Sequence, residues 1–288
     1  MTNSIKKKLR SLFKSVGYSI TLFFYGKIKG IINIHEHDFI QTSKIYLDKK
    51  YTYKIYKIKR CRIYTDTVTD TAFILENKII NGPSFQHRNP KNAEVKENIV
   101  FKIGTPKFKK KLNGTVFSLL TGGGGNANYW HWLFDVLPRF KILEEKIKLE
   151  NIDYFLFPDL QENFQRETLD LLNIPNNKRI SSRIYRHVQS EETITVDHPY
   201  VIRNDPSTEI QNIPSWIMSY LRKKFLINED SNDYPKKIYI DRSDSKSNHR
   251  HLRQIINENE VKEFLKKKNF SIVKLASLSF TDQINLFN

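Results

Sequence analysis

The stretch FSLLTGGGGNANYWHWLFDVLPRFKILE, from Phe117 to Glu144, decides the fold of this chain. An apolar run typical of a buried strand ends at Thr121, and four consecutive glycines, Gly122 to Gly125, follow it. Helical spacing of apolar residues begins near Asn128. We expect the glycines, and Gly123, Gly124 and Gly125 in particular, to let a substrate approach the backbone closely. A flexible surface loop is the alternative interpretation.

The helix after the glycines is predicted to have one polar and one apolar face. On a helix of about 3.6 residues per turn, four polar side chains share a face. They are Asn128, His131, Asp135 and Arg139. The opposite face, which we expect to be buried, consists of Trp130, Leu133, Phe134 and Leu137. Pro138 either kinks this helix or starts a second helix at its first position.

His131 and Asp135 are the candidate catalytic pair. They stand four residues apart, so both side chains can point at one substrate atom. A carboxylate or imidazole within hydrogen-bond reach deprotonates a hydroxyl as a new bond forms, and we predict Asp135 as that base. His131 would orient Asp135 or the substrate. A structural hydrogen bond between the two side chains is the alternative.

Composition indicates a folded, basic protein. The 288 residues are enough for about two domains, and 39 % hydrophobic residues with 12 % aromatic residues can build real cores. Cys61 is the only cysteine, which excludes an intrachain disulfide and fits a reducing compartment. The net charge of +17 favours anionic partners, but the sequence contains no helix-turn-helix, zinc-finger or RNP-type signature. We therefore expect no nucleic-acid partner.

The first 30 residues carry seven basic and no acidic side chains. Between them lies the apolar run VGYSITLFFY, Val16 to Tyr25, which is too short for a transmembrane helix of about 20 residues. The pattern favours a helix that lies on an anionic membrane surface. A frayed basic terminus in solution is the alternative.

Strand and helix patterns alternate along the rest of the chain. Residues 43–80 show short β-branched and aromatic runs with a hairpin turn at Glu76 to Lys78, which predict an N-terminal β region. Residues 81–92 are a loop by their Gly, Pro and Asn content. Tyr154 to Phe157 is predicted to be a strand, and residues 187–201 contain only the short strand patterns ETITV and PYVI. Such alternation indicates a parallel sheet of Rossmann type.

A second α/β region follows the polar linker at residues 228–237. Its predicted elements are the strand KIYIDR, a helix from Gln254 to Lys268, the strand FSIVKL and a helix from Ser279 to Phe287. Arg242 ends the first of these strands, at the carboxyl edge where open α/β sheets bind ligands. Arg253, Asn257 and Glu258 open the next helix, and arginines there can hold a diphosphate. Surface salt bridges are the alternative for Arg253 and Glu258.

The sequence offers little support for a metal site or for common nucleotide motifs. The glycine run is neither a Walker loop nor the dinucleotide G-x-G-x-x-G fingerprint. No pair of aspartates has D-x-D spacing, which often holds a divalent ion with a nucleotide phosphate. His35 to Asp38 form a cluster, but adjacent residues do not share a face. We expect no metal site and no obligatory metal.

Several stretches together resemble glycosyltransferase family 61, and its bacterial branch of capsular polysaccharide biosynthesis proteins in particular. They are NYWHWLFDVLPRF, IYIDR, RQIINENEV, LSFTDQINLF and RIYTDTVTDTAFILENKIINGPSFQ. The resemblance runs from about Arg62 to the last residue. Its most specific part is the N-x-x-H-W-x-x-D-x-L-P-R pattern that contains His131 and Asp135.

The resemblance implies a GT-B enzyme with two Rossmann-like domains, which transfers a sugar from a nucleotide-sugar donor to a glycan hydroxyl with inversion. By position, His131 and Asp135 match the family's acceptor-side pair, and Arg242, Arg253 and Asn257 match the donor half. The family shows two adjacent arginines where this chain has Arg253 and Gln254. Members continue past the last helix into a strand and a His-Gly loop, so we expect a truncated second domain.

These arguments predict three segments and one leading function. The segments are a basic membrane-peripheral segment (1–30), a β region with an acceptor-side Rossmann-like domain (43–227) and the start of a donor-binding domain (236–288). The leading function is sugar transfer in capsular or surface polysaccharide synthesis at the cytoplasmic face of the plasma membrane, with the nucleotide sugar as co-substrate and no other cofactor. The alternative is a non-enzymatic basic protein that binds anionic glycan or lipid at the membrane surface.

Overall fold

The computed structural model describes residues 15–88, 94–121, 125–200, 210–226, 234–243 and 255–287. The chain divides into two compact units. The first unit consists of Met1–Glu162 and Ile174–Leu221, and the second unit of Asn163–Asn173 and Arg222–Asn288. The segment boundaries predicted from the sequence remain predictions.

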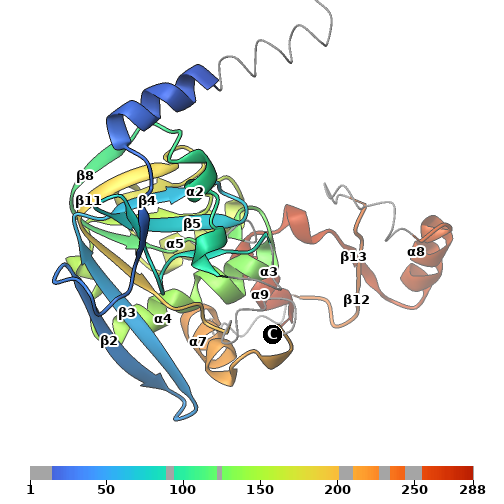
Figure 1. Cartoon of the computed structure of the whole chain (residues 1–288). Coiled ribbons are helices and arrows are strands. Elements are labelled where there is room, and N and C mark those ends of the chain that lie inside the picture. Colours follow the sequence, from blue (N-terminus) through green and yellow to red (C-terminus); the bar gives the residue numbers. More distant parts are fainter. Residues whose placement is uncertain are drawn as a thin grey trace, which may run out of the picture. The chain divides into compact units, whose positions relative to one another are not determined.

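A single sheet of eleven strands, counted over the described residues, forms the centre of the first unit (Figure 1). Its strands are β1 (Gly30–Ile32), β2 (Ile40–Leu47), β3 (Tyr51–Lys59), β4 (Arg62–Thr65), β5 (Asp70–Leu75), β6 (Lys78–Ile80), β7 (Phe85–Gln86), β8 (Lys110–Ser118), β9 (Tyr154–Phe157), β10 (Arg179–Ser181) and β11 (His187–Val196). The main path runs β1-β6-β5-β4-β11-β8-β9-β10, while β3 joins β2 to β11 and β7 pairs with β5.

The sheet is mixed. From β11 through β8 and β9 to β10 all neighbours are parallel, as the alternating pattern predicts. Most of the earlier strands pair antiparallel, and β3 and β4 both join β11, so the predicted β region is continuous with the parallel part. The hairpin at Glu76 to Lys78 is confirmed, because Glu76 and Asn77 adopt the positive φ values of a tight turn between β5 and β6. The mixed α/β class is therefore confirmed.

The helices are short. The α-helices with defined bounds are α2 (Val100–Ile103), α3 (Tyr129–His131), α4 (Pro138–Glu144), α5 (Asn163–Leu171), α7 (Ser215–Phe225), α8 (Glu258–Lys267) and α9 (Phe280–Phe287). Residues 15–25 are also helical. One π-helical turn, η4 (Trp132–Val136), and the short 3-10 turns η2 (Val95–Glu97), η5 (Leu149–Asn151), η6 (Asn176–Lys178), η7 (Ile210–Asn212) and η9 (Leu275–Ser277) complete the set.

A π-helical turn interrupts the helix that carries the candidate pair. In η4 the Leu137 amide donates to the Trp132 carbonyl, five residues back, at 3.1 Å. Pro138 has no amide hydrogen, and it stands at the start of α4, so the second-helix alternative is confirmed. A π turn holds one residue more than an α turn, and therefore shifts the faces of the helix by roughly 100°.

The shift changes which side chains are buried. Of the apolar face predicted from regular helical spacing, only Leu137 is fully buried, while Trp130, Leu133 and Phe134 are half-buried. Asp135 and Arg139, predicted on the polar face, are 4 % exposed each. The π turn thus places an acid and a base of the polar face inside the protein.

Aromatic packing fixes this helix on the sheet. Trp132 and Phe140 are fully buried. The ring centroid of Trp132 is 5.7 Å from that of Phe157, and the ring centroid of Phe140 is 5.9 Å from that of Phe117. Phe117 belongs to β8 and Phe157 to β9, at the parallel part of the sheet. Because large buried aromatic side chains hold their position firmly, the polar side chains between them are pre-positioned.

The second unit confirms the predicted order of strand, helix, strand and helix. Its strands β12 (Ile238–Ile240) and β13 (Ser271–Val273) pair in parallel, with α8 between them and α9 after them. α5 also belongs to this unit although it lies early in the chain, and the Glu167 carboxylate of α5 accepts a hydrogen bond from the Phe280 amide at the start of α9.

Candidate active site

The first turn after the glycine run is built to present His131. Asn128 adopts an extended conformation and caps α3, since its side-chain oxygen accepts a hydrogen bond from the His131 amide at 3.2 Å. His131 therefore lies in the first helical turn, with about one third of its side chain exposed. The predicted substrate-binding residue Asn128 has at least this local structural role.

Asp135 lies between two histidines. Its Oδ2 atom is 2.9 Å from Nδ1 of His131 and 3.7 Å from Nε2 of His198. The side chains of Asp135 and His198 are 5 % and 14 % exposed, against 33 % for His131. The two predicted catalytic residues are thus brought together, and His131 is the member of the cluster that solvent reaches best.

The electrostatics follow from burial and these contacts. Burial raises the pKa of the Asp135 carboxyl, but the hydrogen bond with His131 and the nearby His198 hold it well below its usual range. The hydrogen bond with Asp135 raises the pKa of His131 above its ordinary 6.5. Burial lowers the pKa of His198 despite the nearby carboxylate. Asp135 is therefore ionised at neutral pH, and of the two predicted catalytic residues His131 is the one with the higher pKa.

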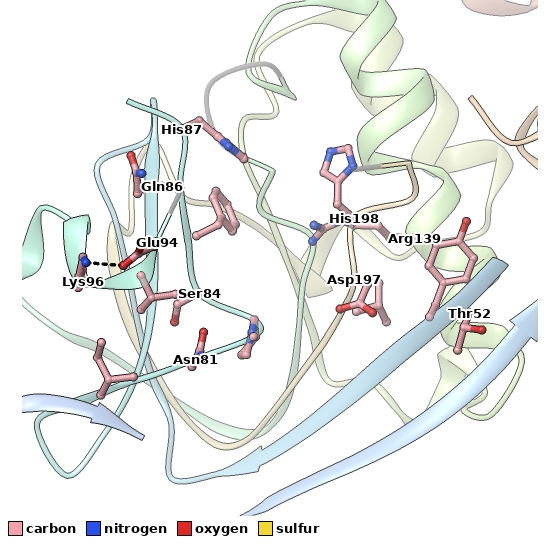
Figure 2. Close-up of a pocket in the computed structure, with 17 residues that line it drawn as sticks. Thr52, Asn81, Ser84, Gln86, His87, Glu94, Lys96, Arg139, Asp197 and His198 are labelled. Atoms are coloured by element: carbon pink, nitrogen blue, oxygen red, sulfur yellow. Dashed lines mark ion pairs between the residues drawn. The ribbon is translucent and has the colours of Figure 1, made fainter. Parts of the chain in front are cut away.

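A cavity of about 570 Å³ adjoins this cluster. Figure 2 shows Arg139, Asp197 and His198 on one side of it, facing Asn81, Ser84 and Gln86 on the other. His198 both lines the cavity and approaches Asp135, so the cavity lies next to the pair of His131 and Asp135, which do not line it themselves. The volume lies within the range of about 300–1,000 Å³ that is typical of small-molecule sites.

Three buried polar atoms at this site have no hydrogen-bond partner among the described residues. They are Oδ1 of Asp135, Nε of Arg139 and Nδ1 of His87. Burial lowers the pKa of Arg139 to about 10, so its guanidinium remains charged at neutral pH. Each unsatisfied buried group costs about 1–3 kcal/mol and therefore needs an explanation, of which a bound ligand is one and an ordered water is another.

Asp197 holds the cavity wall in place. Its carboxylate accepts hydrogen bonds from the Tyr56 hydroxyl and the Lys54 amide of β3, both at 2.7 Å. Tyr200 lies next to His198, with ring centroids 4.6 Å apart, and burial followed by the Asp135 charge raises the pKa of its hydroxyl. The segment after β11 is therefore fixed on β3 on one side and on the Asp135 cluster on the other.

The predicted glycine contacts are described only in part. Gly122, Gly123 and Gly124 lie outside the described residues. At Gly125 an added Cβ atom would lie 2.7 Å from Oγ1 of Thr121 and 2.9 Å from Cγ2 of Val136. Gly125 is therefore required by close packing of the loop against the helix, and a direct ligand contact remains a prediction.

The predicted donor-binding residues belong to the second unit. Arg242 is exposed and follows β12, at the carboxyl end of that strand as predicted. Asn257 precedes α8 and Glu258 begins it, where Oε1 of Glu258 accepts a hydrogen bond from the Tyr239 hydroxyl at 3.1 Å. Arg253 lies outside the described residues. Because these residues and the pair of His131 and Asp135 are in different units, a shared cleft remains a prediction.

The described residues contain no group of three or more His, Cys, Asp or Glu side chains that are arranged to hold a metal ion. Over this part of the chain, the acidic residue and histidines of the candidate site contact one another through single hydrogen bonds and ion pairs.

Sequence reasoning missed His87, Asp197 and His198. All three follow strands, His87 after β7 and the other two after β11, and polar residues at strand ends are a general sign of a site. The signal was present in the sequence as the D-H-P-Y run after ETITV. The pattern PYVI predicts a further strand that includes Pro199 and Tyr200, and this prediction hides the signal. In the structure β11 ends at Val196, and Pro199 and Tyr200 are not in a strand.

Comparison with known proteins gives one match. The family model described as Glycosyltransferase 61 matches residues 129–288, which include the whole helix from α3 through α4. No curated protein and no solved structure matches the chain. The matched region is more than half of the chain and begins at Tyr129, one residue after Asn128, which caps the helix of the candidate pair. The chain therefore belongs to glycosyltransferase family 61, and the activity that this family indicates is that of a glycosyltransferase.

Proposed function

We propose that the protein transfers a sugar from a nucleotide-sugar donor to a hydroxyl of a glycan acceptor, with inversion, in the synthesis of a capsular or surface polysaccharide. The observation that carries this proposal is the hydrogen bond of the partly exposed His131 to a buried, ionised Asp135 beside a polar cavity. Such a pair can remove the acceptor proton.

The geometry favours His131 as the base and Asp135 as its positioning partner, which reverses the roles that the sequence suggested. A base must be accessible to the substrate and must bind a proton more readily than its partner does, and His131 has both properties relative to Asp135. Asp135 is buried and its low pKa makes it a weak base. Since Nδ1 of His131 bonds to Asp135, Nε2 is the nitrogen that faces a substrate.

The reaction then proceeds as a single displacement. The acceptor hydroxyl loses its proton to Nε2 of His131 while its oxygen bonds to the anomeric carbon of the donor sugar. The bond from that carbon to the diphosphate breaks, and the diphosphate leaves with the electron pair. Asp135 stabilises the imidazolium that forms.

We assign the donor to the second unit, in a GT-B arrangement. Arg242, Arg253 and Asn257 are the proposed contacts to the nucleotide diphosphate, because guanidinium groups bind phosphate oxygens bidentately. The parallel pair β12 and β13 with α8 supports this assignment, since arginine and amide side chains then stand near strand carboxyl ends. Single substitution of Arg242 by Gln should raise the KM for the nucleotide sugar and leave the acceptor KM unchanged. An unchanged donor KM would contradict the assignment.

Transfer is tested with a panel of nucleotide sugars labelled in the sugar and a glycan fraction from bacterial membranes. We expect label in the glycan with the wild-type protein and a loss of about 10²- to 10⁴-fold with His131→Gln. The matched control is His35→Gln, because His35 is an exposed histidine of the first unit that does not line the cavity. Equal transfer by His131→Gln and His35→Gln would contradict the proposal.

We also propose that the protein works at the inner face of the plasma membrane. No helix of the described part of the chain is long and apolar enough to cross a membrane. The helix at residues 15–25 exposes 84 % of Phe23 and 68 % of Phe24, and Lys27 and Lys29 follow it. Exposed aromatic rings beside lysines favour attachment to an anionic lipid surface.

Membrane attachment is tested by sedimentation with vesicles of phosphatidylcholine alone or mixed with phosphatidylglycerol. We expect binding to the anionic vesicles only, reduced about tenfold or more by Phe23→Ser with Phe24→Ser. Tyr46→Ser is the control, since Tyr46 is 69 % exposed on β2. Equal loss with the control, or no anionic preference, would contradict attachment through this helix.

A further inference from the structure

The cavity beside the catalytic pair has a charge-balanced wall. Arg139 and Asp197 lie on one side, and Lys96 and Glu94 form an ion pair of 2.6 Å on the other. Burial lowers the pKa of His87 to about 4, and His87 is therefore neutral at pH 7. An anionic ligand would meet the carboxylate of Asp197, and a cationic ligand would meet the guanidinium of Arg139. The wall favours a ligand without net charge.

The same wall needs a ligand that both donates and accepts hydrogen bonds. Nε of Arg139 is a donor without an acceptor among the described residues, and Nδ1 of His87 is also unpaired there. The Asp197 carboxylate accepts two hydrogen bonds, from Tyr56 and Lys54, whereas a carboxylate offers about four acceptor sites. A hydroxyl group donates one hydrogen bond and accepts two, which matches this mixture of groups.

Aromatic side chains add an apolar surface to the cavity. Phe85 and Tyr53 line it, and the rings of Phe85 and His87 stack at 4.9 Å with 26° between their planes. A pyranose ring has polar edges and faces of aliphatic C–H groups. A cavity that offers polar groups to the edges of such a ring and an aromatic side chain to its face is therefore suited to bind a sugar.

We propose that this cavity binds an uncharged sugar unit of the acceptor glycan, with Arg139, His87 and Asp197 as the groups that hold its hydroxyls. The inference rests on the proposed function, because a transferase must hold its acceptor next to the base. His198 provides the connection, since it lines the cavity and its Nε2 is 3.7 Å from the carboxylate that holds His131.

Binding is tested on the whole chain without any donor, by saturation-transfer difference NMR titration. The probes are three uncharged sugars (methyl glucoside, methyl galactoside and lactose), one anionic sugar (glucuronate) and one nucleotide (uridine diphosphate). We expect at least one uncharged sugar to bind, and glucuronate to bind about tenfold more weakly than the corresponding glucoside.

Two variants locate the bound sugar. His87→Phe keeps the ring that stacks on Phe85 and removes both nitrogens, so the fold is retained and sugar affinity should fall about fivefold. Arg139→Met should lower it about tenfold or more. His35→Phe, the same exchange at an exposed histidine outside the cavity, should leave the affinity unchanged.

The inference is overturned if none of the uncharged sugars binds, if glucuronate binds more tightly than the glucoside, or if His87→Phe and His35→Phe have the same affinity. Uridine diphosphate that competes with the sugar would overturn it too, because the cavity would then be a donor site. Failure of the transferase proposal is a separate outcome, seen as absence of sugar transfer with every donor.

Discussion

The polar clusters of the two units differ in whether their partners are complete. In the second unit, Nζ of Lys262 lies 2.8 Å from Asp241 and 3.8 Å from Glu258, so the charges of this cluster satisfy one another. In the first unit, Asp135 is buried with one oxygen unsatisfied, and its partner His131 has one third of its side chain exposed to solvent. The sequence singled out Glu258 of the first-named cluster and His131 and Asp135 of the other, yet among the described residues only the Asp135 cluster has a buried polar atom without a partner.

This difference distinguishes polar residues that form a functional site from polar residues that stabilise the fold. Charged groups that pair with one another stabilise the fold locally, and removing one of them changes mainly the free energy of unfolding. Buried groups without partners cost stability and are expected where function needs them. Substitutions in the two clusters should therefore change different quantities.

The largest effect is expected for Asp135→Asn. The amide removes the negative charge that stabilises a protonated His131, and it no longer selects the tautomer with Nε2 free, so kcat should fall about 10³- to 10⁴-fold. Steady-state transfer kinetics measure this, with circular dichroism as the check on folding. A folded variant with more than one tenth of wild-type kcat would remove Asp135 from the mechanism.

Arg139→Met should separate activity from stability. The guanidinium is buried and unsatisfied at Nε, so a methionine of similar length should leave the free energy of unfolding unchanged or raise it by about 1–3 kcal/mol. Transfer should fall about tenfold or more. Urea unfolding and transfer kinetics measure the two quantities, and lower stability with unchanged transfer would make Arg139 a structural residue.

Gly125→Ala tests whether close packing of the loop against the helix requires a glycine at this position. The new methyl group would lie within 3.0 Å of Pro158 and closer still to Thr121 and Val136, so the free energy of unfolding should fall by about 1–3 kcal/mol. Urea unfolding measures it. Gly17→Ala is the control, because an added Cβ there meets nothing within 4 Å. Equal stability of the two variants would contradict the close packing of Gly125.

The smallest effect is expected for Glu258→Gln in the second unit. The Glu258 carboxylate is one of two partners of Lys262, and Asp241 remains at 2.8 Å, so the free energy of unfolding should hardly change. Transfer should change less than about threefold. A large rise in the donor KM would instead confirm Glu258 as a donor contact, as the sequence suggested.

Local patterns predicted a large part of this molecule. The apolar run before the glycines became β8, the four strand and helix patterns at the end of the chain became β12 to α9, and the four-residue spacing did bring His131 and Asp135 together. Each of these features depends on neighbours within a few residues, which the sequence displays directly.

The features that local patterns did not predict depend on long-range strand pairing and on one irregular helical turn. His198 reaches Asp135 because β11 pairs with β8, and no local pattern gives the partner of a strand. The burial of Asp135 and Arg139 follows from the π turn before Pro138, which regular helical spacing does not anticipate. The members of the site were thus partly visible in the sequence, but their division into exposed base and buried partner was not.

The most direct test of the central claim is the pH dependence of kcat/KM for sugar transfer. His131 must be neutral to accept a proton, and its pKa lies above the ordinary 6.5, so kcat/KM should fall as the pH drops through a pKa above that value. In that case the exposed histidine is the base and the buried carboxylate its partner. If Asp135 were the base, its low pKa would leave kcat/KM constant down to about pH 5, and a flat profile would contradict the account.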